Sequence, residues 1–66
     1  MRILRPAETA KRTGICDREL REWESKGIFP RRFKINPSGA GRAVGHDEDA
    51  VDGWIRERIA AAQIGA

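Results

Sequence analysis

The sequence predicts a mainly helical fold with a small β-hairpin, arranged as a winged helix-turn-helix: helix, turn, helix, two-stranded wing, third helix. Three patterns predict it. Two short helical segments flank Gly14, residues 31–35 alternate basic and apolar side chains ahead of a turn-rich loop, and apolar residues recur at helical spacing after Asp47. A chain of 66 residues accommodates one domain, here residues 1–66, near the lower size limit for a core without disulfides or metals.

The first helix is predicted over residues 6–13. Pro6 suits the first helical position, and Gly14 suits the left-handed position that ends a helix. Ala7 and Ala10 are its only clear core-facing residues. We therefore expect this helix to be held by apolar neighbours rather than by its own propensity, namely by Ile3, Leu4 and Ile15.

The second helix is predicted from Cys16 or Asp17 to Lys26, where Gly27 stops it. Leu20 and Trp23 are spaced to face inward. The opposite stripe places two arginines and two hydrogen-bonding side chains on one exposed face: Arg18, Arg21, Glu22 and Ser25. Two short helices joined by a tight turn at Gly14 form a helix-turn-helix arrangement.

A basic hairpin is predicted after the apolar break at residues 28–30. Residues 31–35 alternate as a half-buried strand does, so we expect Phe33 and Ile35 to point inward and Arg32 and Lys34 outward. Residues 36–41 are rich in turn formers, and residues 42–46, with Arg42, return as the second strand.

The third helix is predicted to begin after Asp47, which is a good N-cap followed by acidic residues that favour the helix dipole. Its apolar residues repeat at helical spacing: Val51, Trp54, Ile55 and Ile59. We expect it to bury Trp54 and Ile55, to serve as scaffold, and to fray over residues 60–66.

Charge divides the chain into two parts. Residues 1–46 hold 11 Lys and Arg against 5 Asp and Glu, whereas residues 47–66 hold 2 against 5. A basic segment of this kind attracts polyanions, of which DNA and RNA are the commonest in the cytosol. The sequence has no apolar run near the roughly 20 residues that span a bilayer and no signal-like N-terminus, so we expect a cytoplasmic protein without a membrane partner.

Catalysis and metal binding are disfavoured. One cysteine and one histidine cannot build a four-ligand zinc site, so no metal and no cofactor are expected. A chain this short seldom encloses a pocket with a supporting shell, and His46 has no accompanying nucleophile. His46 is therefore interpreted as a packing or capping residue. Cys16 begins a helix, where a thiol can become reactive, but a small residue standing in for a cap serine is the better interpretation.

Five short motifs together resemble those of the AlpA-like phage regulators and their excisionase relatives: Arg5-Pro6-Ala7-Glu8, Thr13-Gly14-Ile15, Lys26-Gly27-Ile28-Phe29-Pro30, Arg42-Ala43-Val44-Gly45 and Trp54-Ile55. The resemblance covers essentially the whole chain. It implies a prophage-encoded, nucleoid-associated protein that binds duplex DNA and regulates transcription or steers an integrase toward excision.

The resemblance extends to the DNA-binding head of MerR regulators, and it implies that the second helix enters the major groove while the wing lies along the backbone. Carried onto this chain, it directs Arg18, Arg21 and Glu22 toward bases, with Ser25 on the same stripe. It directs a second set toward phosphates: Arg32, Lys34 and Arg42.

Three residues depart from the family's usual pattern. Cys16 stands where a serine usually opens the second helix, which is expected to weaken the cap. Arg12 stands near a usually apolar position and His46 at a usually aromatic one, and both are expected to thin the core. The second helix is also unusually acidic, so its DNA sequence preference cannot be taken from relatives.

Alternatives remain for both the site and the function. Arg18 and Arg21 can be solvated residues that pair with neighbouring carboxylates, and Glu22 can accept from cytosine or only hold Arg18. The alternative function is a protein-interaction adaptor without stable DNA affinity, which docks an integrase or RNA polymerase through the acidic third helix or an apolar patch. RNA binding is a weaker option because the wing lacks aromatic platforms. Self-association on repeated sites accompanies the DNA-binding hypothesis, because one small domain buries little surface.

Overall fold

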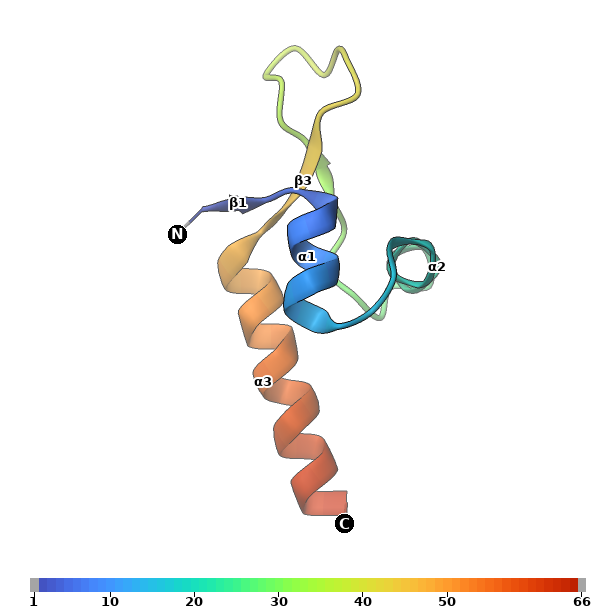
Figure 1. Cartoon of the computed structure of the whole chain (residues 1–66), viewed down its shortest axis with the longest axis vertical. Helices are drawn as coiled ribbons and strands as arrows, with labels where there is room; N and C mark the ends of the chain where they lie inside the picture. The colour runs from blue at the N-terminus through green and yellow to red at the C-terminus, as the bar shows by residue number, and fades with distance from the viewer. Residues whose placement is uncertain (1, 66) are drawn as a thin grey trace.

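The computed structural model describes residues 2–65, with side chains through Gln63. Three helices and three short strands follow one another in the order β1 (Ile3–Leu4), α1 (Pro6–Thr13), α2 (Asp17–Ser25), β2 (Phe33–Lys34), β3 (Val44–Asp47) and α3 (Glu48–Gly65). In Figure 1 the loop between β2 and β3 and the end of α3 lie at opposite ends of the molecule, with α2 and α3 on either side of α1. This mostly helical arrangement is compatible with a helix-turn-helix-type fold.

The predicted bounds of the first two helices are confirmed to within a residue. Pro6 occupies the first turn of α1, and Gly14 ends the helix at φ 75°, donating its N–H to the Ala10 carbonyl at 2.8 Å. α2 begins one residue after Cys16, which is exposed and makes no side-chain cap hydrogen bond. The N-terminus of α2 therefore lacks a side-chain cap, in agreement with the weak cap expected from a cysteine.

The sheet contains the predicted hairpin and one further strand. β2 and β3 pair antiparallel, with Phe33 opposite Gly45. The strands are shorter than predicted, and residues 35–43 form a longer connection, which we call the hairpin loop. β1 pairs with the other edge of β3, giving the order β1-β3-β2. Gly45 permits this approach, because a Cβ there would lie 2.5 Å from the Ile3 side chain and 2.8 Å from the Leu4 carbonyl oxygen.

The core lies where the helices meet the sheet. Its buried apolar residues come from four separate segments: Leu4, Leu20, Phe29 and Val51. The predicted inward residues Trp23, Trp54 and Ile55 pack against them. Trp54 meets the Phe29 ring edge-on at a centroid distance of 4.8 Å, and its Nε1 donates to the Ile28 carbonyl at 2.7 Å.

The third helix runs further than predicted. Asp47 directly precedes it, as expected, but also pairs with Ile3 in the sheet. The helix continues through Gly65 and so includes most of the tail for which fraying is expected, while Ala66 lies outside the described residues. Its second half is exposed from Arg56 to Gln63 and includes Ile59 at 53% exposure. In the described part of the chain no helix is long and apolar enough to cross a membrane.

His46 does not thin the core, and that expectation is wrong for His46, whereas Arg12 is exposed and takes no part in the core. The Arg12 guanidinium reaches from α1 to α3, where it pairs with Glu48 at 3.0 Å and Asp52 at 3.1 Å. His46 is completely buried and meets the Phe29 ring edge-on at 5.4 Å. An imidazole thus fills the space of an aromatic ring, and its two nitrogens find polar partners. Its interpretation as a packing residue is confirmed.

Candidate nucleic-acid interface

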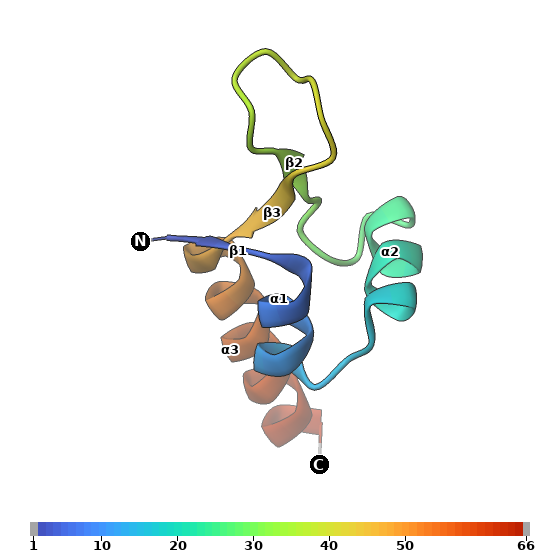
Figure 2. The same ribbon diagram turned by 45° about the horizontal axis from the view of Figure 1, so that its top comes forward.

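The exposed stripe of α2 forms one part of the candidate interface. Leu20 is fully buried and Trp23 packs against the core, so the helix presents its opposite face to solvent. The four predicted stripe residues are all exposed: Arg18, Arg21, Glu22 and Ser25. The predicted amphipathic arrangement of α2 is therefore confirmed. In Figure 2 this helix stands to one side of the molecule, away from α3.

The stripe residues differ in how firmly they are held. Arg21 Nε donates to Asp17 at 2.8 Å, and Glu22 pairs with Lys26 at 3.1 Å. Ser25 Oγ donates to the Glu22 carbonyl at 2.7 Å. By contrast, no hydrogen bond or ion pair engages the Arg18 guanidinium within residues 2–65. Glu22 does not hold Arg18, so that alternative is not the arrangement seen here.

Asp17 remains ionised at the start of α2. Its partial burial alone would raise its pKa, but hydrogen bonds from Arg21 and Arg32 outweigh that effect and hold the pKa below its ordinary value. A charged carboxylate in the first turn also interacts favourably with the helix dipole. Asp17 thereby keeps the Arg21 side chain against the helix.

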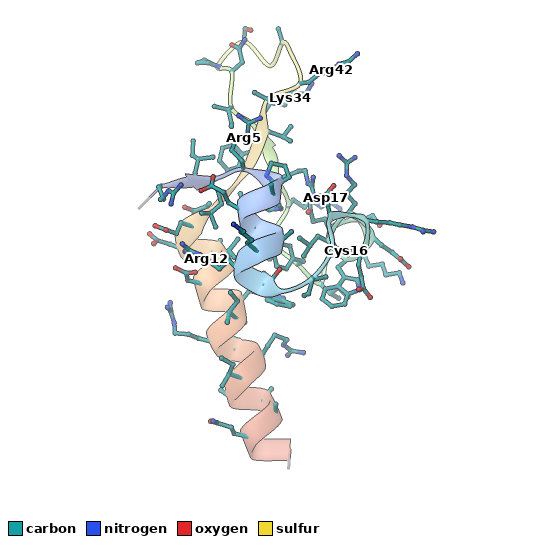
Figure 3. The ribbon with its side chains drawn as sticks, in the orientation of Figure 1. Arg5, Arg12, Cys16, Asp17, Lys34 and Arg42 are labelled. Atoms are coloured by element: carbon teal, nitrogen blue, oxygen red, sulfur yellow. The ribbon has the colours of Figure 1, made fainter. Side chains whose placement is uncertain are left out.

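The hairpin supplies a second exposed basic group. Lys34 on β2 is exposed and donates from Nζ to the Gly41 carbonyl at 3.1 Å. Arg42 is exposed and has no polar partner among the residues that the structure describes. Figure 3 places both side chains at the hairpin, apart from Asp17 and Cys16 at the start of α2. The outward direction predicted for Lys34 is confirmed.

Arg32 is not an outward-facing strand residue, and that prediction is wrong. Its side chain is only 13% exposed and lies beneath α2, with Nη2 2.8 Å from Glu24 and 2.9 Å from Asp17. Phe33, predicted to point inward, is 41% exposed. The strand begins at Phe33, so the alternation does not extend back to Arg32. A carboxylate at the inward position Glu24 needs a cation, because an unpaired buried charge costs several kcal/mol.

Arg31 is an exposed basic residue that the sequence pattern does not single out. It is exposed, and no hydrogen bond or ion pair joins its side chain to the described residues. It borders a shallow surface cleft with Ser25, at the junction between α2 and the hairpin. The signal was Glu24: its inward position requires one cation, and Arg32 meets that requirement, so Arg31 is left without a partner in the described residues.

These features describe a small, mostly helical fold, compatible with a helix-turn-helix type, that carries exposed basic groups on one helix and on the adjoining hairpin. The described residues contain no group of three or more His, Cys, Asp or Glu side chains able to hold a metal ion.

The family model for the prophage CP4-57 regulatory protein (AlpA) matches residues 2–59, and the chain belongs to this family of phage regulatory proteins. The resemblance seen in the sequence motifs is thereby confirmed. Searches of curated proteins and of solved structures returned no match. Membership in a regulatory family is consistent with a DNA-binding regulator and suggests a non-enzymatic role.

Proposed function

We propose that this protein is a sequence-specific duplex-DNA-binding regulator, acting as a single winged helix-turn-helix domain in transcription or in prophage excision. One observation carries the proposal: guanidinium groups without partners in the described residues stand on the exposed face of α2 and around the hairpin, at Arg18, Arg31 and Arg42. Guanidinium groups with unused donors suit both guanine edges and phosphates. Membership in a phage regulatory family favours DNA as the polyanion that these groups bind.

The roles divide between the two parts of the surface. Arg18 reads a base edge in the major groove, with Arg21, Glu22 and Ser25 beside it on the same stripe. Lys34 and Arg42 hold the backbone as the wing, and Arg31 contacts a phosphate between them and α2. Arg32 is left out of this interface, because Glu24 and Asp17 already engage its guanidinium.

The salt dependence of binding tests this proposal. Binding of the full chain to duplex DNA should weaken as salt rises, and a plot of log K against log salt should correspond to roughly 3–5 phosphate contacts. A fluorescence anisotropy titration on labelled duplexes measures it, with single-stranded RNA as the comparison. A slope near zero, or no duplex binding at low salt, refutes the proposal.

A second candidate function is docking to an integrase or RNA polymerase. Its support is a shallow cleft lined by Ile28, Phe29, Pro30 and Trp54, in which Ile28 is 55% exposed. The same surface is available for self-association of copies bound to repeated sites, which would enlarge the small contact area of one module. Ile28→Ser should abolish docking or cooperativity while leaving binding to a single DNA site unchanged.

A further inference from the structure

A chain of polar groups crosses the interior and links every segment around the candidate interface. Thr9 on α1 has its Oγ1 2.9 Å from His46 Nδ1, and His46 Nε2 on β3 lies 2.9 Å from Glu24 Oε2 on α2. Arg32 then reaches Glu24 with its Nε, its Nη2 and its backbone N–H, and extends Nη2 to Asp17. We call these five residues the polar network: Thr9, Asp17, Glu24, Arg32 and His46.

The polar network is ionised at its centre. Burial alone would raise the pKa of Glu24, but hydrogen bonds from Arg32 and His46 outweigh it and hold the pKa below its ordinary value. The Glu24 carboxylate can only accept, so His46 Nε2 carries a proton and donates. The Arg32 guanidinium must therefore stay paired with Glu24, because breaking a buried ion pair would leave an uncompensated charge.

Stability alone does not account for this arrangement. Thr9 and His46 are fully buried, and Arg32 Nη1 is a buried donor for which the described residues supply no partner. Each such unsatisfied group costs free energy, and well-packed apolar residues of similar volume often stabilise a fold as well or better. The distinctive property of hydrogen bonds is direction, since they weaken steeply when donor and acceptor are misaligned.

The polar network connects α2 with the hairpin, the two elements that a DNA-binding surface must hold at a fixed angle. Arg32 grips α2 at both ends, through Asp17 in its first turn and Glu24 in its last, and stands two residues before Lys34 on β2. His46 connects the same carboxylate to β3, the strand that follows Arg42. The stripe of α2 and the hairpin are therefore oriented against each other through one carboxylate and one guanidinium.

We propose that Glu24, Arg32 and His46 are positioning residues that set the angle between α2 and the hairpin, and thereby the sequence selectivity of the protein on DNA. The inference rests on the proposed DNA binding. Selective binding needs α2 in the groove and the hairpin on the backbone at the same time, whereas non-selective binding needs only positive charge. Loosening the network therefore lowers affinity for the preferred site and leaves affinity for other duplexes nearly unchanged.

Two variants of the full chain loosen the network, one at its end on α1 and one at its centre. Thr9→Val removes the hydroxyl next to His46 without changing shape or charge, on a helix outside the candidate interface. Glu24→Gln keeps the volume but removes the charge that Arg32 grips. Their matched controls are Thr13→Val, a hydroxyl on α1 that bonds only to local backbone, and Glu57→Gln, an exposed carboxylate on α3.

The measured quantity is the ratio of dissociation constants for scrambled duplex and for the site selected from a random pool, at one salt concentration. We expect the ratio to fall about tenfold in both network variants, which corresponds to about 1.4 kcal/mol of lost selectivity. It should stay within about twofold of wild type in both controls. Circular dichroism at the assay temperature verifies that each variant is folded, and if Glu24→Gln is not, the outcome for Thr9→Val decides.

A folded network variant with the wild-type ratio overturns the inference and leaves DNA binding intact. Absence of DNA binding by the wild-type chain overturns the proposed function instead. A proportional loss on both duplexes also refutes the inference, because it indicates a general loss of folded protein rather than of selectivity.

Discussion

Replacing Trp54 tests the assignment of the core most directly. Its ring contacts Phe29 and Trp23, at centroid distances of 4.8 and 5.9 Å, and its Nε1 donates to the Ile28 carbonyl. Trp54→Ala removes all of these contacts at a cost of roughly 3–5 kcal/mol. At roughly 0.05–0.15 kcal/mol per residue the whole chain is stable by only about 3–10 kcal/mol. The alanine variant should therefore be largely unfolded or melt more than about 15 °C lower.

Trp54→Phe separates the two contributions. It keeps an aromatic ring against Phe29 and loses the hydrogen bond to Ile28, which contributes about 1 kcal/mol. A decrease of about 4–8 °C in Tm corresponds to that loss in a chain of this size. Ile59→Ala, on the exposed half of α3, is the control and should change the free energy of unfolding by less than about 0.5 kcal/mol.

Urea and thermal unfolding followed by far-ultraviolet circular dichroism measure these differences without depending on tryptophan fluorescence. The expected order of stability is wild type, Trp54→Phe, then Trp54→Ala, with Ile59→Ala close to wild type. If Trp54→Ala melts within a few degrees of wild type, the ring does not anchor the core and the packing described above is wrong.

Three further outcomes are expected. Gly45→Ala should lower stability by about 1–3 kcal/mol in a thermal melt, because its Cβ meets the backbone of β1. Gly53→Ala on α3 should raise stability by up to about 1 kcal/mol, because the nearest atom to its Cβ, Arg56 Nη2, lies at an ordinary contact distance of 3.9 Å. The pKa of Glu24 in the folded state lies below its ordinary value. The ionised carboxylate therefore stabilises the fold fully at neutral pH, and this stabilisation is lost as the pH falls from the ordinary pKa to the lower folded-state pKa. Glu24→Gln should flatten the curve of Tm against pH over this acidic range. In competition binding, Arg18→Ala should lose about 1–3 kcal/mol of binding free energy on the preferred site and relax the preference at one base position. Arg42→Ala should weaken binding to all duplexes alike and lower the slope of log K against log salt by about one. The reverse pattern would show that the hairpin, not α2, recognises the bases.

Local signals in the sequence predicted the helices and the hairpin. Pro6 and Gly14 delimit α1 because their backbone preferences act without help from the rest of the chain. The spacing of Leu20 and Trp23 predicted which face of α2 is exposed, since a helix with one apolar stripe has only one way to bury it.

What was missed depends on contacts between distant residues. β1 contains only two residues and forms because Gly45, far along the chain, leaves room for it. Arg32 turned inward because Glu24 occupies an inward position on another element, a demand that strand alternation does not encode. For the same reason the polar network was not predicted, since His46 and Thr9 become neighbours only after folding.

The pairing of β1 with β3 also determines how the protein can be made. Leu4 finds its partner His46 about 40 positions later, and the Glu48 amide donates to the Arg2 carbonyl at 3.0 Å. During synthesis the first residues must therefore wait until the start of α3 has left the ribosome. The helix pair that emerges first has too few local apolar contacts to persist alone. Sheet formation therefore requires residues 44–47, because a chain that lacks β3 has no partner strand for either β1 or β2.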